Sequence, residues 1–301
     1  MGIISTLKPR SNNVTCSEST KHTRVEWSNL TQSQKKVYLT AVQCLFSLPS
    51  QTGIDGTVTR YDDLNAMHQV QTKTIHRVGQ FLPFHRLYVH AYEKILREEC
   101  GYTGPTPWWD ETKDAGNFSN SSIFDSKSGF GGDGVGSNKC VVDGPFANIT
   151  LHIGPGTSNK DHCLSRFIDE GNSSLANTTY VSSCQSQSTY IDYLDKSALT
   201  THGAGHGGVG GVMYDIDSSP GDPLFYLHHA WYDRLWWNWQ KADLQNRLYQ
   251  VGGYTTQTEP ADGWKNLTLD YTLTTYNIVP NVTVREVMDI QGGYLCYDYD
   301  Y

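Results

Sequence analysis

Histidines are concentrated in two parts of this chain, and their grouping limits the folds that the chain can adopt. Seven of the eleven histidines form two clusters: His68, His76 and His85 in the first, and His202, His206, His228 and His229 in the second. An isolated histidine is usually a surface residue or a hydrogen-bonded core residue, but that explanation does not suit seven clustered ones. A fold that brings these side chains together would form a metal centre.

The chemistry of the clusters narrows the choice of metal. Residues four apart on a helix share a face, so His202 and His206 can offer two imidazoles to one ion. Imidazoles without cysteine or carboxylate are a poor match for structural zinc, which favours thiolates. The zinc-protease motif His-Glu-X-X-His is absent because Gly203 follows His202, and no Glu-X-X-His pair of a di-iron bundle occurs. Copper, zinc, nickel and iron all accept imidazole ligands, and copper leads the affinity order. Six imidazoles shared by two copper ions can activate O2 as a co-substrate.

Glycosylation triplets and cysteines indicate a secreted, extracellular chain. Asn-X-Ser/Thr triplets occur at Asn13, Asn29, Asn117, Asn120, Asn148, Asn172, Asn177, Asn266 and Asn281. Chance would give only about three in such a chain, so we expect passage through a secretory pathway and glycosylation at these sites. The seven cysteines fit an oxidising compartment with up to three disulfides and one thiol left over, in pairs that the sequence does not assign.

Charge and hydropathy exclude two classes of partner. The net charge is −8 and the basic residues are scattered, which is unfavourable for binding a nucleic-acid backbone. No apolar run approaches the roughly 20 residues that cross a membrane. The expected partners are therefore small molecules, with the chain acting as a monomer.

The local patterns predict a mainly α fold, with a helical-bundle core around the metal site, long loops and a few short strands. Because no repeat or linker divides the sequence, we expect one catalytic domain over residues 1–301. Apolar spacing and end signals predict helices over residues 31–48, 84–99, 190–198 and 224–242. Turn-forming residues predict irregular loop over 101–160 and a glycine-rich turn over 203–211, and alternation predicts short strands within 265–301.

Two motifs around the histidines resemble a known family. Phe81-Leu-Pro-Phe-His85-Arg86 is similar to the first copper signature of the tyrosinase and catechol oxidase family, and residues 222–236, DPLFYLHHAWYDRLW, are similar to the second. The two signatures together are highly specific, and the resemblance extends over residues 60–301. It is nearest to the short secreted fungal-type polyphenol oxidases. Tyr297-Asp-Tyr-Asp-Tyr301 resembles the motif that closes the family's catalytic core, so we expect no C-terminal shielding domain.

The resemblance implies a ligand set for each of two copper ions. It gives copper A the ligands His68, His76 and His85, and it gives copper B the ligands His202, His206 and His229. His229 is preferred to His228 because the family's ligand precedes a helical aspartate, here Asp233, by four residues. His228 then points elsewhere, either as a packing residue or as one that supports the ligands by hydrogen bonds without binding the metal. Arg86 and Asp233 either orient the ligands through hydrogen bonds or form a plain buried ion pair.

The same resemblance implies oxidation of o-diphenols (catechols) to o-quinones, with reduction of O2 to water. Family members that hydroxylate monophenols carry an asparagine directly after the first copper B ligand and a glutamate a few residues before it. Gly203 and Ala198 stand at those positions here, which favours diphenol oxidation. Gly207 follows the second copper B ligand, and Ile216 is expected to overhang copper A, so Gly203, Gly207 and Ile216 are the expected substrate contacts.

Other functions are compatible with parts of the sequence. A tyrosinase with monophenol hydroxylation, or an o-aminophenol oxidase, would use the same ligands. A haemocyanin-like O2 carrier would need a bulky aromatic side chain from another domain over copper A. A structural or carbohydrate-binding glycoprotein would suit the glycosylation triplets, but it leaves the histidine clusters unexplained.

Overall fold

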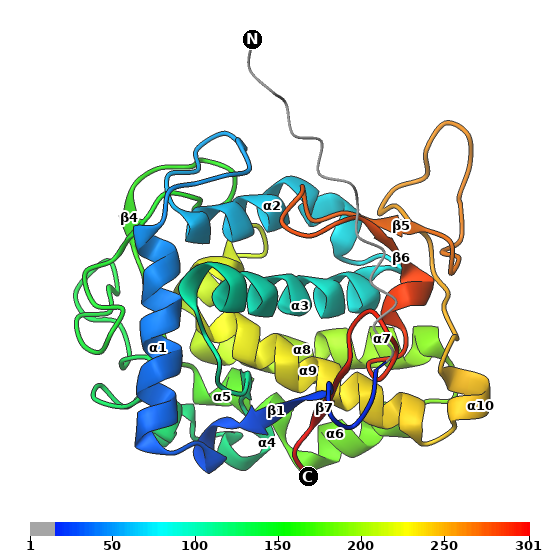
Figure 1. The fold of residues 1–301 in the computed structure, drawn as a ribbon, viewed down its shortest axis with the longest axis horizontal. Helices are drawn as coiled ribbons and strands as arrows, with labels where there is room; N and C mark the ends of the chain where they lie inside the picture. Colours follow the sequence, from blue (N-terminus) through cyan, green and yellow to red (C-terminus); the bar gives the residue numbers. More distant parts are fainter. Residues whose placement is uncertain (1–15) are drawn as a thin grey trace.

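The computed structural model describes residues 16–301, and helices are the main regular structure in that part of the chain (Figure 1). The helices are α1 Gln32–Ser47, α2 Arg60–Ile75, α3 Phe81–Cys100, α4 Glu111–Asp114, α5 Glu170–Ser173, α6 Thr178–Gln185, α7 Tyr190–Leu199, α8 Thr201–Val209, α9 Leu224–Lys241 and α10 Leu244–Arg247. The strands are β1 His22–Glu26, β2 Pro107–Trp108, β3 Thr150–Leu151, β4 His162–Cys163, β5 Thr272–Leu273, β6 Val282–Thr283 and β7 Tyr297–Tyr299. The predicted mainly α fold is confirmed.

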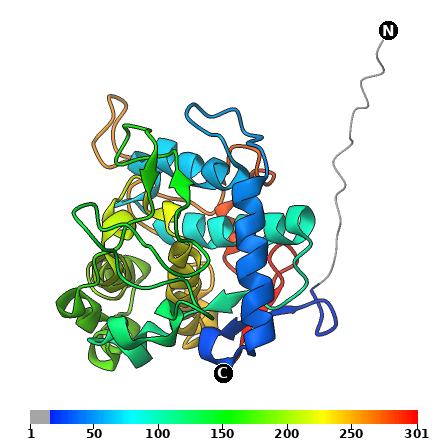
Figure 2. The same cartoon turned by 90° about the vertical axis from the view of Figure 1, so that its left-hand side faces the viewer.

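The centre of the fold is a stack of long helices. In Figure 1, α3 lies between α2 and α9, and α1 crosses one end of the stack, where Figure 2 shows it upright in the foreground. Helices α3 and α9 pack directly on each other, and α8 packs against α9. Large aromatic side chains fill the core, among them the fully buried Trp231, Trp236 and Tyr88. The stack therefore brings α2, α3, α8 and α9, which carry or adjoin the clustered histidines, into one region.

The end signals of the predicted helices are found where the sequence places them. Thr31 and Gln34 form a reciprocal capping box at the start of α1, which satisfies main-chain donors that have no partner within the helix. Helix α3 ends at Gly101, whose φ of 63° is in the left-handed region that glycine adopts without strain. The helices predicted over 190–198 and 224–242 correspond to α7 and α9.

The glycine-rich turn predicted over 203–211 is wrong, because residues 201–209 form helix α8. Glycine in a helix costs roughly 1 kcal/mol relative to alanine, but close packing outweighs that cost here. A Cβ atom on Gly208 would lie 2.7 Å from a ring carbon of Phe118. The glycines allow α8 to approach its neighbours α5, α7 and α9. The low helix propensity of glycine predicted a turn, but tertiary packing stabilises a helix here.

Helix α2 has no counterpart among the predicted helices. Nearly all of its side chains are buried, including the polar Asp62, Asp63 and Asn65. A helix that is covered on every side lacks the apolar stripe that marks a surface helix in a sequence. The 101–160 region holds only short elements, in agreement with the predicted loop.

Short strands and disulfides tie distant parts of the chain together. Strand β1 pairs in parallel with both β2 and β7, so the first described strand contacts the last one. The disulfides are Cys16–Cys296, Cys44–Cys100 and Cys140–Cys163, and Cys184 is a buried free thiol. The expectation of three disulfides and one remaining thiol is confirmed. Within residues 16–301, no helix is both long and apolar enough to cross a membrane.

Candidate metal centre

Seven histidines from four segments meet inside the helix stack. The first histidine group consists of His68 on α2, His76 directly after α2 and His85 on α3; the second consists of His202 and His206 on α8 and His228 and His229 on α9. Within each group, one ring nitrogen of every member lies within 4.8 Å of those of the others. The fold thus gathers all of the clustered histidines into two adjacent groups, each able to hold a metal ion.

Main-chain carbonyl oxygens fix how several of these imidazoles are turned. The Nδ1–H group of His68 donates to Asp217 O (3.1 Å), and that of His206 donates to Met213 O (2.6 Å). In the same way, the Nδ1–H groups of His76 and His85 donate to Thr72 O (3.1 Å) and to Phe81 O (2.8 Å). A proton held on Nδ1 leaves the lone pair on Nε2, which is the arrangement of metal-binding histidines.

Several ring nitrogens in the two groups are buried without a partner. Nε2 of His68 and of His85, and both ring nitrogens of His229, are shielded from solvent and have no hydrogen-bond partner among residues 16–301. A buried polar atom without a hydrogen bond destabilises the fold by about 1–3 kcal/mol. A cluster of such nitrogen atoms therefore indicates a site that binds a ligand. Nε2 of His202 and Nε2 of His206 are 3.1 Å apart, so both can lie about 2 Å from one ion, a usual metal–nitrogen distance. The donor set fits a metal.

The two groups face each other across a short distance. The rings of His85 and His229 are stacked, with centroids 4.5 Å apart and planes inclined by 12°. Phe225 lies against His229 at 4.1 Å, and Phe81 meets His202 edge to face at 4.9 Å. Two ions bound here would share one apolar chamber.

Burial keeps these imidazoles uncharged. It lowers the pKa of His76 to about 4 and that of His206 to about 3. Burial, with repulsion from neighbouring imidazoles, also lowers the pKa of His85, His202 and His229 well below the usual value. Neutral imidazoles have the free lone pairs that metal binding requires.

Glu111 is a site residue that the sequence analysis missed. It lies on the short helix α4 and is fully buried, with Oε1 at 2.6 Å from Nδ1 of His228. Burial raises the pKa of Glu111 and lowers that of His228 to about 3, which favours an uncharged hydrogen-bonded pair. A Cβ atom on Gly205 would overlap His228 and lie 2.8 Å from Oε1 of Glu111. Nothing in the residues around Glu111 indicates a partner more than a hundred positions away.

Arg86 and Asp233 belong to a buried ion network beside the site. Nε of Arg86 donates to Asp233 at 2.5 Å and Nη1 of Arg24 donates at 3.1 Å. The hydroxyl groups of Tyr297 and Tyr299 donate to the same carboxylate at 2.5 and 2.6 Å. Burial opposes ionisation of Asp233, but the two arginines outweigh it and lower the pKa of its carboxyl group. Asp233 thus binds two arginines and two tyrosines, and the network joins α3, α9, β1 and β7.

The part of the site nearest to solvent lies on α8. Of the seven histidines only His202 and His206 are partly exposed. A Cβ atom on Gly203 would have only Ala198 O, at 3.5 Å, in ordinary contact, and one on Gly207 would touch the side chain of Asn172. Gly203, which is partly exposed, therefore has room for a small side chain, whereas Gly207 is buried.

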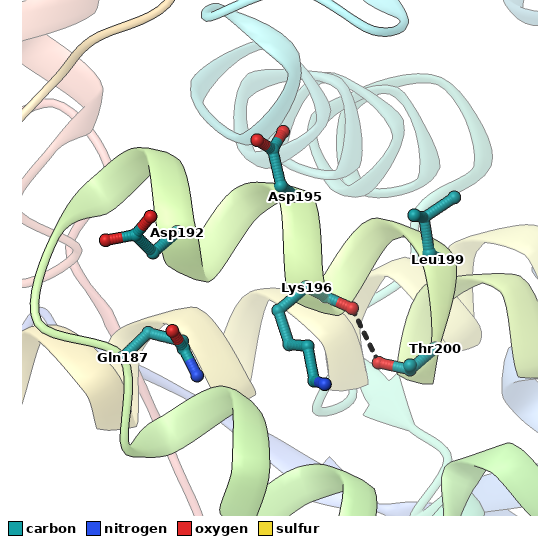
Figure 3. A pocket seen from close by; sticks show the side chains of 6 residues that line it. All are labelled: Gln187, Asp192, Asp195, Lys196, Leu199 and Thr200. Atoms are coloured by element: carbon teal, nitrogen blue, oxygen red, sulfur yellow. Dashed lines mark hydrogen bonds between the residues drawn. The ribbon is translucent and has the colours of Figure 1, made fainter.

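A surface hollow elsewhere on the molecule has no histidine in its lining. It measures about 410 Å³ and is lined by Gln187, Asp192, Asp195, Lys196, Leu199 and Thr200 from α6 to α8 (Figure 3). The Thr200 hydroxyl donates to the main-chain oxygen of Lys196. Asp195, the acidic residue nearest before His202, is exposed at this hollow rather than buried with the histidines.

Comparison with known proteins agrees with the chemistry of the site. Residues 58–242 match the family model described as the common central domain of tyrosinase. The chain is 37% identical over 289 residues to Tyrosinase ustQ of Aspergillus flavus, with 92% of this chain and 78% of the relative covered. It is 32% identical over 345 residues to N-acetyl-6-hydroxytryptophan oxidase ivoB of Emericella nidulans, covering 95% of this chain and 94% of the relative.

Solved structures of copper oxidases and of a related oxygen carrier are similar to this chain as well. A mutant of polyphenol oxidase from Thermothelomyces thermophila superposes with a TM-score of 0.87 and 29% identity, covering 95% of this chain and 91% of the other. A functional unit of octopus hemocyanin, at a TM-score of 0.62 and 22% identity, shares the fold. The chain belongs to the tyrosinase family of type 3 copper oxidases, whose members act on phenolic substrates.

Proposed function

We propose that this chain oxidises o-diphenols to o-quinones with two copper ions, and that O2 is reduced to water. Copper A would be held by His68, His76 and His85, and copper B by His202, His206 and His229. The observation that carries the proposal is the pair of facing imidazole groups, in which buried Nε2 atoms have no partner within residues 16–301. When bound, the copper pair supplies redox capacity and Lewis acidity toward a phenolic oxygen.

The protein side chains would orient the ions and the substrate. Carbonyl oxygens hold the Nδ1 atoms of four of the imidazoles, which leaves Nε2 of each free to face a metal ion; these are His68, His76, His85 and His206. Phe225 and Phe81 pack on the rings and limit the water around them. The substrate would enter beside α8 at the partly exposed Gly203, and Gly207, which is buried against Asn172, and the 46% exposed Ile216 remain the other proposed contacts.

Diphenols are favoured over monophenols because the opening lacks groups that would take a proton from a monophenol. Gly203 has no side chain, Ala198 offers only its main-chain oxygen, and Asp195 is exposed at a separate hollow. A catechol needs less help, since it loses its protons while both of its oxygens approach the metals. Monophenol hydroxylation is the second candidate, and the relatives that are named tyrosinases favour it.

Oxygen consumption tests the proposal directly. Copper-loaded protein would be given 4-methylcatechol and, separately, 4-methylphenol, with His229→Ala as the inactive control. We expect prompt O2 uptake with the catechol and a long lag or none with the phenol. Similar rates on both would show a tyrosinase, and no uptake on either would refute the oxidase function.

A second variant makes this test sharper. Gly203→Asn introduces the amide that hydroxylating family members carry after the first copper B ligand. If the missing amide limits the native chain, this variant should shorten the lag with 4-methylphenol while leaving the catechol rate within about twofold. An unchanged lag would show that this position does not decide the reaction.

We further propose that residues 1–301 form one catalytic domain that is secreted, glycosylated and monomeric. Three disulfides and an excess of glycosylation triplets support secretion. Of the candidate asparagines, Asn13 lies outside the described residues and Asn177 is half-buried; the exposed ones are Asn29, Asn117, Asn120, Asn148, Asn172, Asn266 and Asn281. Mass loss on treatment with an N-glycosidase would test the modification.

A further inference from the structure

His228 lies among the proposed copper B ligands, although it is not one of them. Its ring centroid is 4.8 Å from that of His206, 5.3 Å from that of His202 and 5.0 Å from that of His229. The side chain of His228 is fully buried. The imidazole is therefore a neighbour of all three proposed ligands, two of which are on α8 and one of which is on its own helix, α9.

Two residues on other helices hold the imidazole of His228 in one orientation. Nδ1 of His228 is 2.6 Å from Oε1 of Glu111 on the short helix α4. The same edge of the ring lies against the main chain of α8, because a Cβ atom on Gly205 would overlap Nδ1 and Cε1 of His228. Rotation of the ring would break the hydrogen bond to Glu111.

Packing alone does not account for a glutamate at position 111. Its side chain is fully buried, and among residues 16–301 neither Oε2 of Glu111 nor Nε2 of His228 has a hydrogen-bond partner. A buried polar pair with unsatisfied atoms is often no more stable than an apolar pair of similar size. An apolar side chain would fill the position at least as well, so the carboxyl group is better explained by the orientation that it gives to His228.

We propose that Glu111 is a positioning residue for copper B and that it acts through His228. By fixing this imidazole, Glu111 sets the spacing between the two ligands on α8 and the one on α9. The rings paired with His228 do not include those of the first histidine group, so the effect is confined to copper B. The inference rests on the proposed function for the assignment of the ligands.

Variants that hold a single copper ion separate the two sites. His85→Ala should keep copper B alone and His229→Ala copper A alone, and the lone Cu(II) ion in each gives a paramagnetic resonance spectrum that reports its ligand geometry. Glu111→Leu, which removes the hydrogen-bonding group, and Glu111→Gln, which keeps one, are then introduced into each of these two parents. Copper affinity is measured by competition with EDTA.

The two sites should respond differently. In the His85→Ala parent, Glu111→Leu should shift the hyperfine splitting of the copper B signal and weaken copper binding about tenfold, the lower end of the effect of residues that orient ligands from outside. Glu111→Gln should leave both close to the values of the parent. In the His229→Ala parent, neither variant should change the copper A signal. Equal losses at both sites, an unchanged copper B signal in Glu111→Leu, or a Glu111→Gln variant that behaves like Glu111→Leu overturns the inference.

The double variant Glu111→Leu/His228→Leu serves if the single leucine variant does not fold. It removes the ring nitrogen that would otherwise be buried without a partner, and it should show the same change at copper B. A double variant with the signal and affinity of the His85→Ala parent overturns the inference.

These measurements need no turnover, which separates the inference from the proposed function. The predicted change at copper B in a chain that does not oxidise catechols would contradict the proposed function alone. A His85→Ala chain that binds no copper would overturn both the inference and the proposed copper B site.

Discussion

Gly205 should be the position on α8 where the smallest substitution does the most damage. It lies between His202 and His206 on the helix and faces His228 and Glu111. In Gly205→Ala the new methyl carbon would overlap Nδ1 of His228 and lie 2.8 Å from Oε1 of Glu111. Real Cβ atoms do not come so close to other atoms, so α8 must move away from α9 or His228 must turn.

The magnitude follows from two opposing terms. Overpacking of a buried contact costs about 1–3 kcal/mol, while alanine gains roughly 1 kcal/mol over glycine in a helix. Gly203→Ala is the matched control, since its methyl group would meet only Ala198 O at an ordinary 3.5 Å. The control should be as stable as wild type or up to about 1 kcal/mol more stable. Gly205→Ala should therefore be about 1–3 kcal/mol less stable than the control.

The substitution should also change metal binding, because α8 and α9 together carry the proposed copper B ligands. We expect Gly205→Ala to hold close to one copper ion per chain under conditions in which Gly203→Ala holds two. Urea unfolding of the metal-free proteins measures the stability difference, and elemental analysis after dialysis measures copper. If Gly205→Ala matches the control in both measurements, the packing role of Gly205, His228 and Glu111 is refuted.

Three further predictions concern buried ionisable groups. The pKa of His76 is about 4 in the folded chain and about 6.5 when unfolded, so between these values the unfolded state binds more protons and stability falls as the pH is lowered. The free energy of unfolding of the metal-free protein should therefore fall by about 1.4 kcal/mol per pH unit for each such histidine as the pH is lowered from about 6.5 to 4. Urea midpoints that do not change over this range would contradict this prediction. Asp233→Asn leaves Arg86 buried without a carboxylate, while Arg24 keeps only its ion pair with Glu93, so the substitution should lower the free energy of unfolding by about 3–5 kcal/mol. A loss below about 1 kcal/mol in urea titrations would show that the network is not structural. Burial raises the pKa of the Cys184 thiol, so a thiol reagent should label it only after unfolding, and rapid labelling of native protein followed by mass spectrometry would disprove this.

The parts of the fold that the sequence predicted are those that leave a local signal. The start of helix α1 is marked in the sequence by Thr31 and its capping box, and the end of α3 is marked by Gly101. Helix α2 also begins with a capping box, formed by Thr59 and Asp62, but almost all of its side chains are buried, so its polar residues do not mark a solvent face and no apolar stripe follows that start signal. Helix α8 was mistaken for a turn because the benefit of its glycines lies in other elements, such as Phe118 against Gly208.

The site shows the same division between local and long-range information. The two histidine clusters and the motifs at Phe81–Arg86 and 222–236 marked the metal centre, since each motif is contiguous in the chain. Glu111 was not predicted, because its hydrogen bond to His228 joins residues 117 positions apart. The hydrogen bonds from His206 to Met213 O and from His68 to Asp217 O could not be predicted either, because main-chain carbonyl oxygens are the same in every residue type.

Counting copper in wild type and in two single-histidine variants tests the central claim most directly. The account predicts two copper ions per chain for wild type, and about one for His85→Ala and for His229→Ala. The remaining ion in each variant should give the paramagnetic resonance signal of a lone Cu(II), which the coupled wild-type pair lacks. A wild-type chain that holds one copper or none, or a His229→Ala chain that still holds two coupled ions, would contradict it.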